Sequence, residues 1–175
     1  MIPFDMNMGA IMDARSLACY IKKYFSEHST IDAKCSDIMI QKCLYFLFAY
    51  WGGYISKGEK ENNFEIKKEK KFLFYNKIEA WEYGPVVRDV YFSNKRCLLD
   101  EFAISDDELF QDNYLLKSTI DGLLEDLIKI SPFKLVTLSH QDESWIKNYK
   151  LKLEKSIPNQ EIDKTDIINE YECKV

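Results

Sequence analysis

The chain has 175 residues, of which 46% are hydrophobic and 14% aromatic, and this composition excludes an intrinsically disordered protein. Its 24 basic and 29 acidic side chains give a net charge of −5, which opposes non-specific binding to nucleic acid. No apolar run is long enough to span a bilayer, and no Lys or Arg precedes Arg15 as a secretory signal requires, so we expect a cytoplasmic protein without a membrane partner.

A first amphipathic helix is predicted after Asp13, a residue that suits the N-cap. Its apolar side chains fall on one stripe at helical spacing: Leu17, Ala18, Ile21, Tyr24 and Phe25. We expect residues 1–12 to form an N-terminal extension and residues 13–175 to form a single domain, because domains of this length are common.

The second predicted helix runs from about residue 36 to residue 51 and is apolar on nearly every side. Ser36 suits its N-cap, and the pair Gly52-Gly53 is predicted to end it. A membrane helix is the alternative, but Asp37 and Lys42 interrupt the run and it is too short to span a bilayer. We therefore expect a mainly α fold, a compact helical domain around this central buried helix.

A charged insertion is predicted at about residues 57–71, within a stretch from Lys57 to Lys77 that holds seven Lys and four Glu. A basic patch for nucleic acid is the alternative to a solvated loop, but the interleaved Glu side chains cancel much of its field. A short extended segment or hairpin is predicted near 72–83, because residues 78–83 alternate apolar and polar side chains before a turn at Gly84-Pro85.

The remaining elements are predicted to be helical, with a short helix over 88–95. The capping box Ser105–Glu108 is predicted to open the longest helix, which ends near Pro132 and contains Gly122 as a weak point. A short helix carrying Trp145 follows. Pro158 is placed at the first position of a last helical segment that ends near Tyr171.

Few residue groups suggest catalysis. Ser139, His140 and Asp142 are the one neighbouring set of nucleophile, base and acid, but side chains on one turn usually point apart, and G-x-S-x-G is absent. We interpret them as a helix start, in which Ser139 and Asp142 cap backbone N–H groups and His140 makes a buried hydrogen bond. A hydrolase-like enzyme using these three residues is the less favoured alternative.

Metal and cofactor sites are not predicted. The five cysteines show no C-x-x-C spacing, and the gaps between His28, Cys35 and Cys43 match no usual zinc pattern. Phosphate-binding glycine motifs are also missing. We therefore predict no catalytic residues, no metal and no cofactor, and a binding protein in preference to an enzyme. Residues 100–175 carry 9 basic and 17 acidic side chains, a balance that favours a basic protein partner.

Four segments, in order along the chain, resemble the Panacea domain, the SocA-like antitoxin family of bacterial and phage toxin-antitoxin systems. They are Gln41–Phe46, with Lys42 and Tyr45; Ile78–Val87, with Trp81, Tyr83, Gly84, Pro85 and Val86, followed by Val90-Tyr91; Leu138-Ser139-His140 with Trp145 downstream; and Ile157-Pro158-Asn159. Two departures are the length of the charged insertion and Cys43, which stands where a leucine is common.

The resemblance implies a helical protein that neutralises a cognate toxin, usually encoded beside it, by direct contact. An adaptor that delivers its toxin to a protease is the alternative that the family offers. Trp81, Tyr83, Tyr91 and Trp145 are candidate anchors for the partner. The competing interpretation is that Trp81 and Trp145 pack in the core, while Tyr83 and Tyr91 keep their hydroxyls at a surface groove. The chain has no separate DNA-binding segment of the kind many relatives carry, so direct nucleic-acid binding is not expected.

Overall fold

The computed structural model describes residues 9–29 and 35–175. Its helices are α1 (Ala14–His28), α2 (Asp37–Lys60), α3 (Arg88–Lys95), α4 (Asp106–Phe110), α5 (Tyr114–Leu127), α6 (Pro132–Ser139), α7 (Glu143–Lys155) and α8 (Lys164–Glu172). Two 3-10 turns, η2 (Ile66–Lys68) and η3 (Leu99–Phe102), and the strands β1 (Ala10–Met12), β2 (Phe72–Phe74), β3 (Ile78–Trp81) and β4 (Gly84–Val87) complete the elements. The predicted mainly α fold is confirmed. Residues 1–8 of the predicted extension lie outside the described residues.

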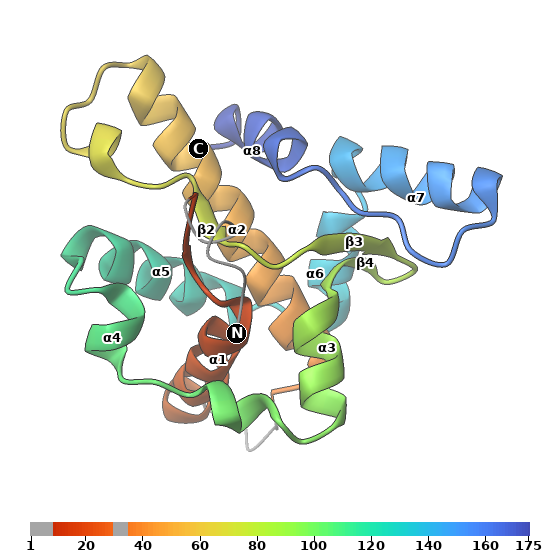
Figure 1. Cartoon of the computed structure of the whole chain (residues 1–175), viewed down its shortest axis with the longest axis horizontal. Coiled ribbons are helices and arrows are strands. Elements are labelled where there is room, and N and C mark those ends of the chain that lie inside the picture. The colour runs from red at the N-terminus through yellow and green to blue at the C-terminus, as the bar shows by residue number, and fades with distance from the viewer. Residues whose placement is uncertain (1–8, 30–34) are drawn as a thin grey trace.

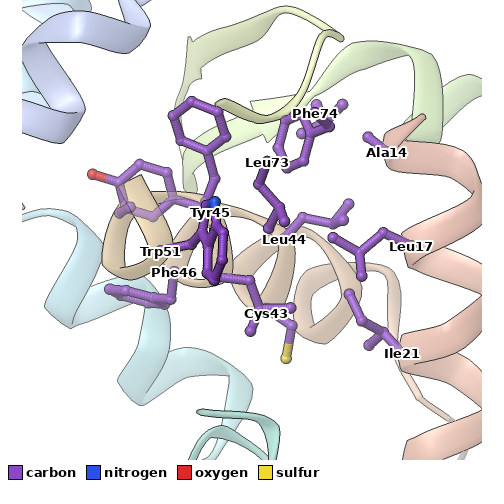
Figure 2. Packing of buried hydrophobic residues seen from close by; sticks show 14 of the residues in the cluster. Ala14, Leu17, Ile21, Cys43, Leu44, Tyr45, Phe46, Trp51, Leu73 and Phe74 are labelled. Carbon is purple, nitrogen blue, oxygen red and sulfur yellow. The ribbon is translucent and has the colours of Figure 1, made fainter. Parts of the chain in front are cut away.

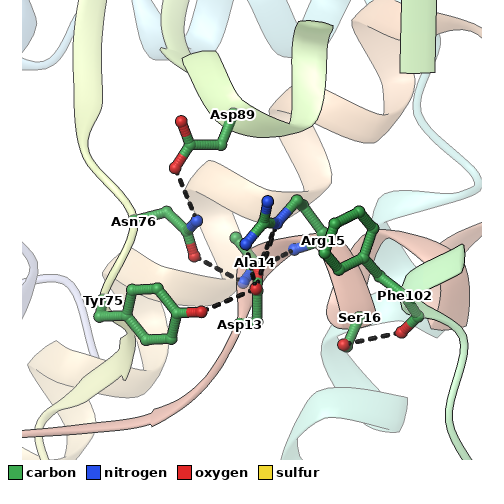
Figure 3. A network of polar contacts seen from close by, with 8 residues as sticks. All are labelled: Asp13, Ala14, Arg15, Ser16, Tyr75, Asn76, Asp89 and Phe102. Atoms are coloured by element: carbon green, nitrogen blue, oxygen red, sulfur yellow. Dashed lines mark hydrogen bonds and ion pairs between the residues drawn. The ribbon is translucent and has the colours of Figure 1, made fainter. Parts of the chain in front are cut away.

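The N-terminus of α1 is held by a polar network (Figure 3). Asp13 is the N-cap, as predicted, and its carboxylate accepts the backbone N–H of Arg15 at 2.8 Å. Tyr75, which follows β2, donates to the same carboxylate at 2.7 Å, and Asn76 accepts the N–H of Ala14 at 2.8 Å. These bonds attach the start of α1 to the connection between β2 and β3.

The helix α2 runs through the middle of the molecule, with α4 and α5 on one side and α7 on the other (Figure 1). Its side chains are buried around most of its circumference, and the stripe of α1 packs against it, with Leu17 and Ile21 pointing towards Leu44 (Figure 2). Ser36 caps it as predicted, through a hydrogen bond from the Met39 N–H. The predicted central helix therefore exists.

The predicted end of that helix at Gly52-Gly53 is wrong, because α2 continues to Lys60. The two glycines lie where α8 crosses α2. A Cβ on Gly53 would lie 2.8 Å from the carbonyl carbon of Tyr171, and one on Gly52 would collide with Ile168. They allow two helices to approach closely and do not terminate one.

Two small sheets lie beside α2. The strand β1 pairs in parallel with β2, and β3 pairs with β4 as an antiparallel hairpin in which Trp81 faces Gly84. Gly84-Pro85 therefore begins β4, and the turn falls at residues 82–83, contrary to the predicted turn. Residues 160–162 extend the hairpin on its other side, since Gln160 accepts the Ala80 N–H at 2.8 Å.

The charged insertion is only partly a solvated loop. Residues 61–65 are exposed, whereas Ile66 in η2 is buried against Gly58 in the last turns of α2. Trp51 also donates its indole N–H to the carbonyl of Lys70 at 2.9 Å. Both ends of the insertion are therefore attached to the core, and its exposed part is shorter than the sequence indicates.

The helix predicted to be the longest is divided in two. Ser105 caps α4 as predicted, but Gln111 and Asp112 adopt left-handed conformations that end it, and Asn113 caps α5. Pro158 lies in the connection after α7, and α8 begins at Lys164 behind the cap Asp163, so its predicted helical position is wrong. The pairing of residues 160–162 with β3 prevents a helix there. No helix within 9–29 and 35–175 is both long and apolar enough to cross a membrane.

Candidate functional site

A groove of about 310 Å³ lies between the start of α2, the β3–β4 turn and α3. Its lining consists of Asp37, Ile38, Gln41, Lys42, Trp81, Glu82, Tyr83, Val86 and Tyr91. We call it the Lys42 groove. Its walls are mostly apolar or aromatic, and five of its residues are among those that the sequence singled out. A groove of this size is at the lower end of the range for ligand pockets.

Lys42 is the most unusual residue of the groove. It is 1% exposed, and its Nζ donates a 2.7 Å hydrogen bond to the carbonyl of Pro85. Burial lowers the pKa of this amine to about 7. Its neighbour Gln41 holds the same strand by exchanging two hydrogen bonds with the backbone of Val87, at 2.8 and 3.3 Å. Two buried polar residues near the start of α2 thus position β4.

Gly84 makes room for the Lys42 amine. Its backbone φ of +94° is a value that residues with a side chain rarely adopt. A Cβ at this position would lie 2.7 Å from Nζ of Lys42 and would also collide with Oγ of Ser139. Ser139 is completely buried and donates to the carbonyl of Val136 at 2.9 Å, within its own helix. Gly84 is therefore required both by the backbone and by the space around the lysine.

A ladder of aromatic rings lies beside the hairpin. His140 stacks on Trp145 with ring centroids 4.1 Å apart, and Trp145 stacks on Tyr149 at 4.8 Å. The indole of Trp145 donates to the carbonyl of Trp81 at 3.0 Å, which fixes the ladder to β3. Burial and the nearby Lys42 lower the pKa of His140, and the backbone of Glu82 opposes them. The imidazole is therefore favoured in its neutral form.

The side chain of Asp142 bonds to residues other than Ser139 and His140. Asp142 is 2% exposed and accepts from Tyr45 at 2.6 Å, Tyr171 at 2.8 Å and Lys174 at 2.6 Å. Burial and this carboxylate raise the pKa of the Tyr45 hydroxyl well above its ordinary value, so it remains a donor. Ser139, His140 and Asp142 are thus not joined as a hydrogen-bonded triad in the structure.

The predicted capping roles of these residues are also wrong. Asp142 stands at the N-cap of α7, but its side chain accepts no backbone N–H there. Glu170 of α8 accepts those of Glu143 and Ser144 instead, at 2.9 and 3.0 Å. Nε2 of His140 is buried without a hydrogen-bond partner among the described residues. No local pattern in the sequence points to Glu170, because this residue reaches the start of α7 from a separate helix.

Ten of the eleven residues singled out in the sequence lie in or next to the Lys42 groove. Lys42, Trp81, Tyr83, Val86 and Tyr91 line it; Gly84, Pro85 and Ser139 surround the amine; His140 and Trp145 form the adjoining ladder. Tyr45 lies apart, with Asp142. Trp145 is buried, as core packing requires, whereas Tyr83 is 56% exposed. The sequence reasoning missed Asp37, Ile38 and Glu82 as lining residues.

Comparisons with known proteins give no further assignment: no family model matches the chain, and neither the curated proteins nor the solved structures include a match. In the part of the chain that the structure describes, no three His, Cys, Asp or Glu side chains gather in a way that could hold a metal ion.

Proposed function

We propose that the chain is a cytoplasmic antitoxin of the Panacea type that neutralises a cognate toxin, encoded beside it, by direct protein contact. The observation that supports this proposal is the convergence of three of the four segments that carry the family resemblance. Residues of α2, the β3–β4 hairpin, α6 and α7 lie around one groove although they are far apart in the sequence. Such convergence is expected of a surface with a common role.

The chemistry of this surface favours binding over catalysis. Tyr83 presents a large exposed ring at the groove, and Trp81 meets Tyr91 edge to face with ring centroids 4.9 Å apart. Exposed aromatic side chains held by rigid neighbours are typical anchors of protein interfaces. Ser139 and Asp142 use their polar atoms in hydrogen bonds within the fold, so the proposed function assigns them a structural role.

Co-expression with the product of the adjacent gene tests the proposal. We expect the chain to restore growth of cells that express that product and to co-purify with it as a stable complex. If the neighbour is demonstrably toxic and neither result is obtained, the proposal is wrong. Restored growth with falling toxin levels would instead indicate a protease adaptor, because an inert complex preserves the toxin.

A matched pair of variants tests the surface. Tyr83→Ala removes an exposed ring at the groove, whereas Tyr114→Ala removes one that is 84% exposed at the start of α5. We expect Tyr83→Ala to weaken the complex at least tenfold, as truncation of an anchor costs more than about 1 kcal/mol, and Tyr114→Ala to leave it unchanged. If the two variants change the affinity of the complex equally, Tyr83 is not an anchor for the toxin.

A further inference from the structure

The ammonium group of Lys42 is incompletely paired. It carries three N–H donors, and the carbonyl of Pro85 is its one hydrogen-bond acceptor among the described residues. In the same ranges no ion pair involves Lys42, and the residue is only 1% exposed. A buried charge without a counter-ion destabilises a fold. A hydrogen-bond acceptor that enters the groove would therefore gain more binding free energy from Lys42 than from a hydrated lysine.

The charged and titratable groups around Lys42 do not supply that counter-ion. Asp37 of α2 pairs with Lys95 at 2.6 Å. Glu82 and Tyr83 on the hairpin turn are exposed, Tyr91 of α3 is engaged with Trp81, and His140 after α6 has its pKa lowered in part by the lysine itself. Lys42 is one of the residues that line the groove. A Cβ at residue 84 would lie 2.7 Å from Nζ, and the glycine leaves that position free.

We propose that the Lys42 groove binds a carboxylate of the partner protein, an aspartate or glutamate adjacent to a large apolar side chain, with Lys42 as its counter-ion. The apolar side chain would lie against Ile38, Val86 and the aromatic walls, and the carboxylate would reach Nζ beside Pro85. This inference rests on the proposed function for the source of the carboxylate, which is the toxin. The groove volume of about 310 Å³ suits one or two side chains and excludes a folded element.

Binding of a carboxylate would be coupled to protonation of Lys42. In the free protein burial lowers the pKa of this amine to about 7, so the neutral and the protonated forms are both populated near neutral pH. A bound carboxylate favours the ammonium form and raises the pKa. Binding above pH 7 therefore requires proton uptake, and the affinity for a carboxylate should fall as the pH rises from 7 to 9.

Two blocked dipeptides serve as probes, acetyl-phenylalanyl-aspartyl amide and its asparaginyl counterpart, which differ in charge and hardly in shape. Binding to the full chain is followed by NMR titration of the indole N–H signals, since Trp81 lines the groove. At pH 6.5 we expect the aspartyl peptide to bind at least about fivefold more tightly, because charge-assisted hydrogen bonds are roughly twice as strong as neutral ones. The preference should disappear by pH 9.

Two variants and one control locate the effect. Lys42→Met should abolish the preference, whereas Lys129→Met, the same change at an exposed position after α5, should retain it. Because Lys42→Met alters the core, Glu82→Gln provides a second test at an exposed position. It removes a repelling charge from the groove and should strengthen binding of the aspartyl peptide about twofold, without affecting the asparaginyl one.

Equal binding of the two peptides, no binding of either, or a preference that survives Lys42→Met would overturn the inference. These outcomes are distinguishable from failure of the proposed function. If the peptides behave as expected while the adjacent gene product is not neutralised, the groove recognises carboxylates in another partner. If neutralisation succeeds and the peptides fail, the toxin binds without a carboxylate at Lys42.

Discussion

The hydroxyl of Tyr45 donates a 2.6 Å hydrogen bond to the carboxylate of Asp142, which connects the middle of α2 to the start of α7. Tyr171 and Lys174 donate to the same carboxylate from α8 and the residues after it. One buried acidic side chain therefore holds three segments that are distant in the sequence, and the three donors to it are not among the residues that line the Lys42 groove.

Replacement of this carboxylate should destabilise the protein. Asp142→Asn removes the charge that Lys174 faces and replaces one acceptor oxygen with a donor. Both phenols donate to Oδ2 and Lys174 donates to Oδ1, so the amide nitrogen would face either two hydroxyl donors or the ammonium group. We expect the free energy of unfolding in urea to fall by roughly 2–4 kcal/mol. Tyr45→Phe, which removes one of the three donors, should cost only about 1 kcal/mol. Equal losses for the two variants would show that the carboxylate does not organise the cluster.

The two helical glycines Gly53 and Gly122 should respond to alanine in opposite directions. Gly122 in α5 has open space where a Cβ would be, so Gly122→Ala should stabilise the protein by about 0.5–1 kcal/mol through helix propensity. Gly53→Ala has the same propensity gain but forces α8 away from α2, so we expect a net loss of about 1–3 kcal/mol. Thermal unfolding measures both changes. A stabilising Gly53→Ala would contradict the close approach of the helices.

The conformation of Gly84 predicts a further loss of stability. Gly84→Val should lower the free energy of unfolding by about 2 kcal/mol or more, because it combines a φ of +94° with displacement of the Lys42 amine. Denaturant titration is the measurement. Pro85→Ala, which keeps the backbone carbonyl that Lys42 uses, is the neighbouring control and should cost less. A Gly84→Val protein with an unchanged midpoint would remove both reasons for the glycine.

The burial of Lys42 predicts a pH dependence of stability. In the unfolded chain its pKa is near the ordinary 10.5, whereas in the fold it is about 7. Between these values the unfolded chain binds more protons, so this residue's unfavourable contribution is complete below pH 7 and diminishes as the pH rises towards 10.5. Lys42→Met should therefore stabilise the protein by on the order of 1–3 kcal/mol at pH 6.

The measurement is the difference in unfolding free energy between Lys42→Met and the natural chain across pH 6 to 10. The stabilising effect should shrink steadily above pH 7. A difference that is independent of pH would mean that the amine keeps its ordinary pKa in the fold. Lys129→Met, at an exposed position, provides the baseline for loss of one lysine charge.

Local signals in the sequence were sufficient for several elements. The caps Asp13 and Ser36 and the short helix at 88–95 were predicted correctly, because each depends on residues within one or two turns. The left-handed residues Gln111 and Asp112, which divide the helix after Ser105, gave no signal, since neither is a glycine. Propensity alone could not place that break.

Other features depend on contacts between distant segments. Gly52 and Gly53 resemble a helix stop in the sequence, but they are needed because α8 crosses α2 there. Pro158 suits a helix start, but residues 160–162 pair with β3 and form no helix. In the candidate site, the family resemblance singles out Lys42 and the residues of the hairpin. Their common groove, and the burial that leaves the amine without a counter-ion, emerge only from the tertiary arrangement.

The crossing of α8 over Gly52 and Gly53 also bears on how the protein is made. A ribosome delivers the chain from its N-terminus, so α2 emerges long before Tyr171 is available to cover it. During that interval one side of this central helix faces solvent, and the nascent polypeptide is open to chaperones and proteases. Completion of the native state must therefore wait until translation of the last helix is finished.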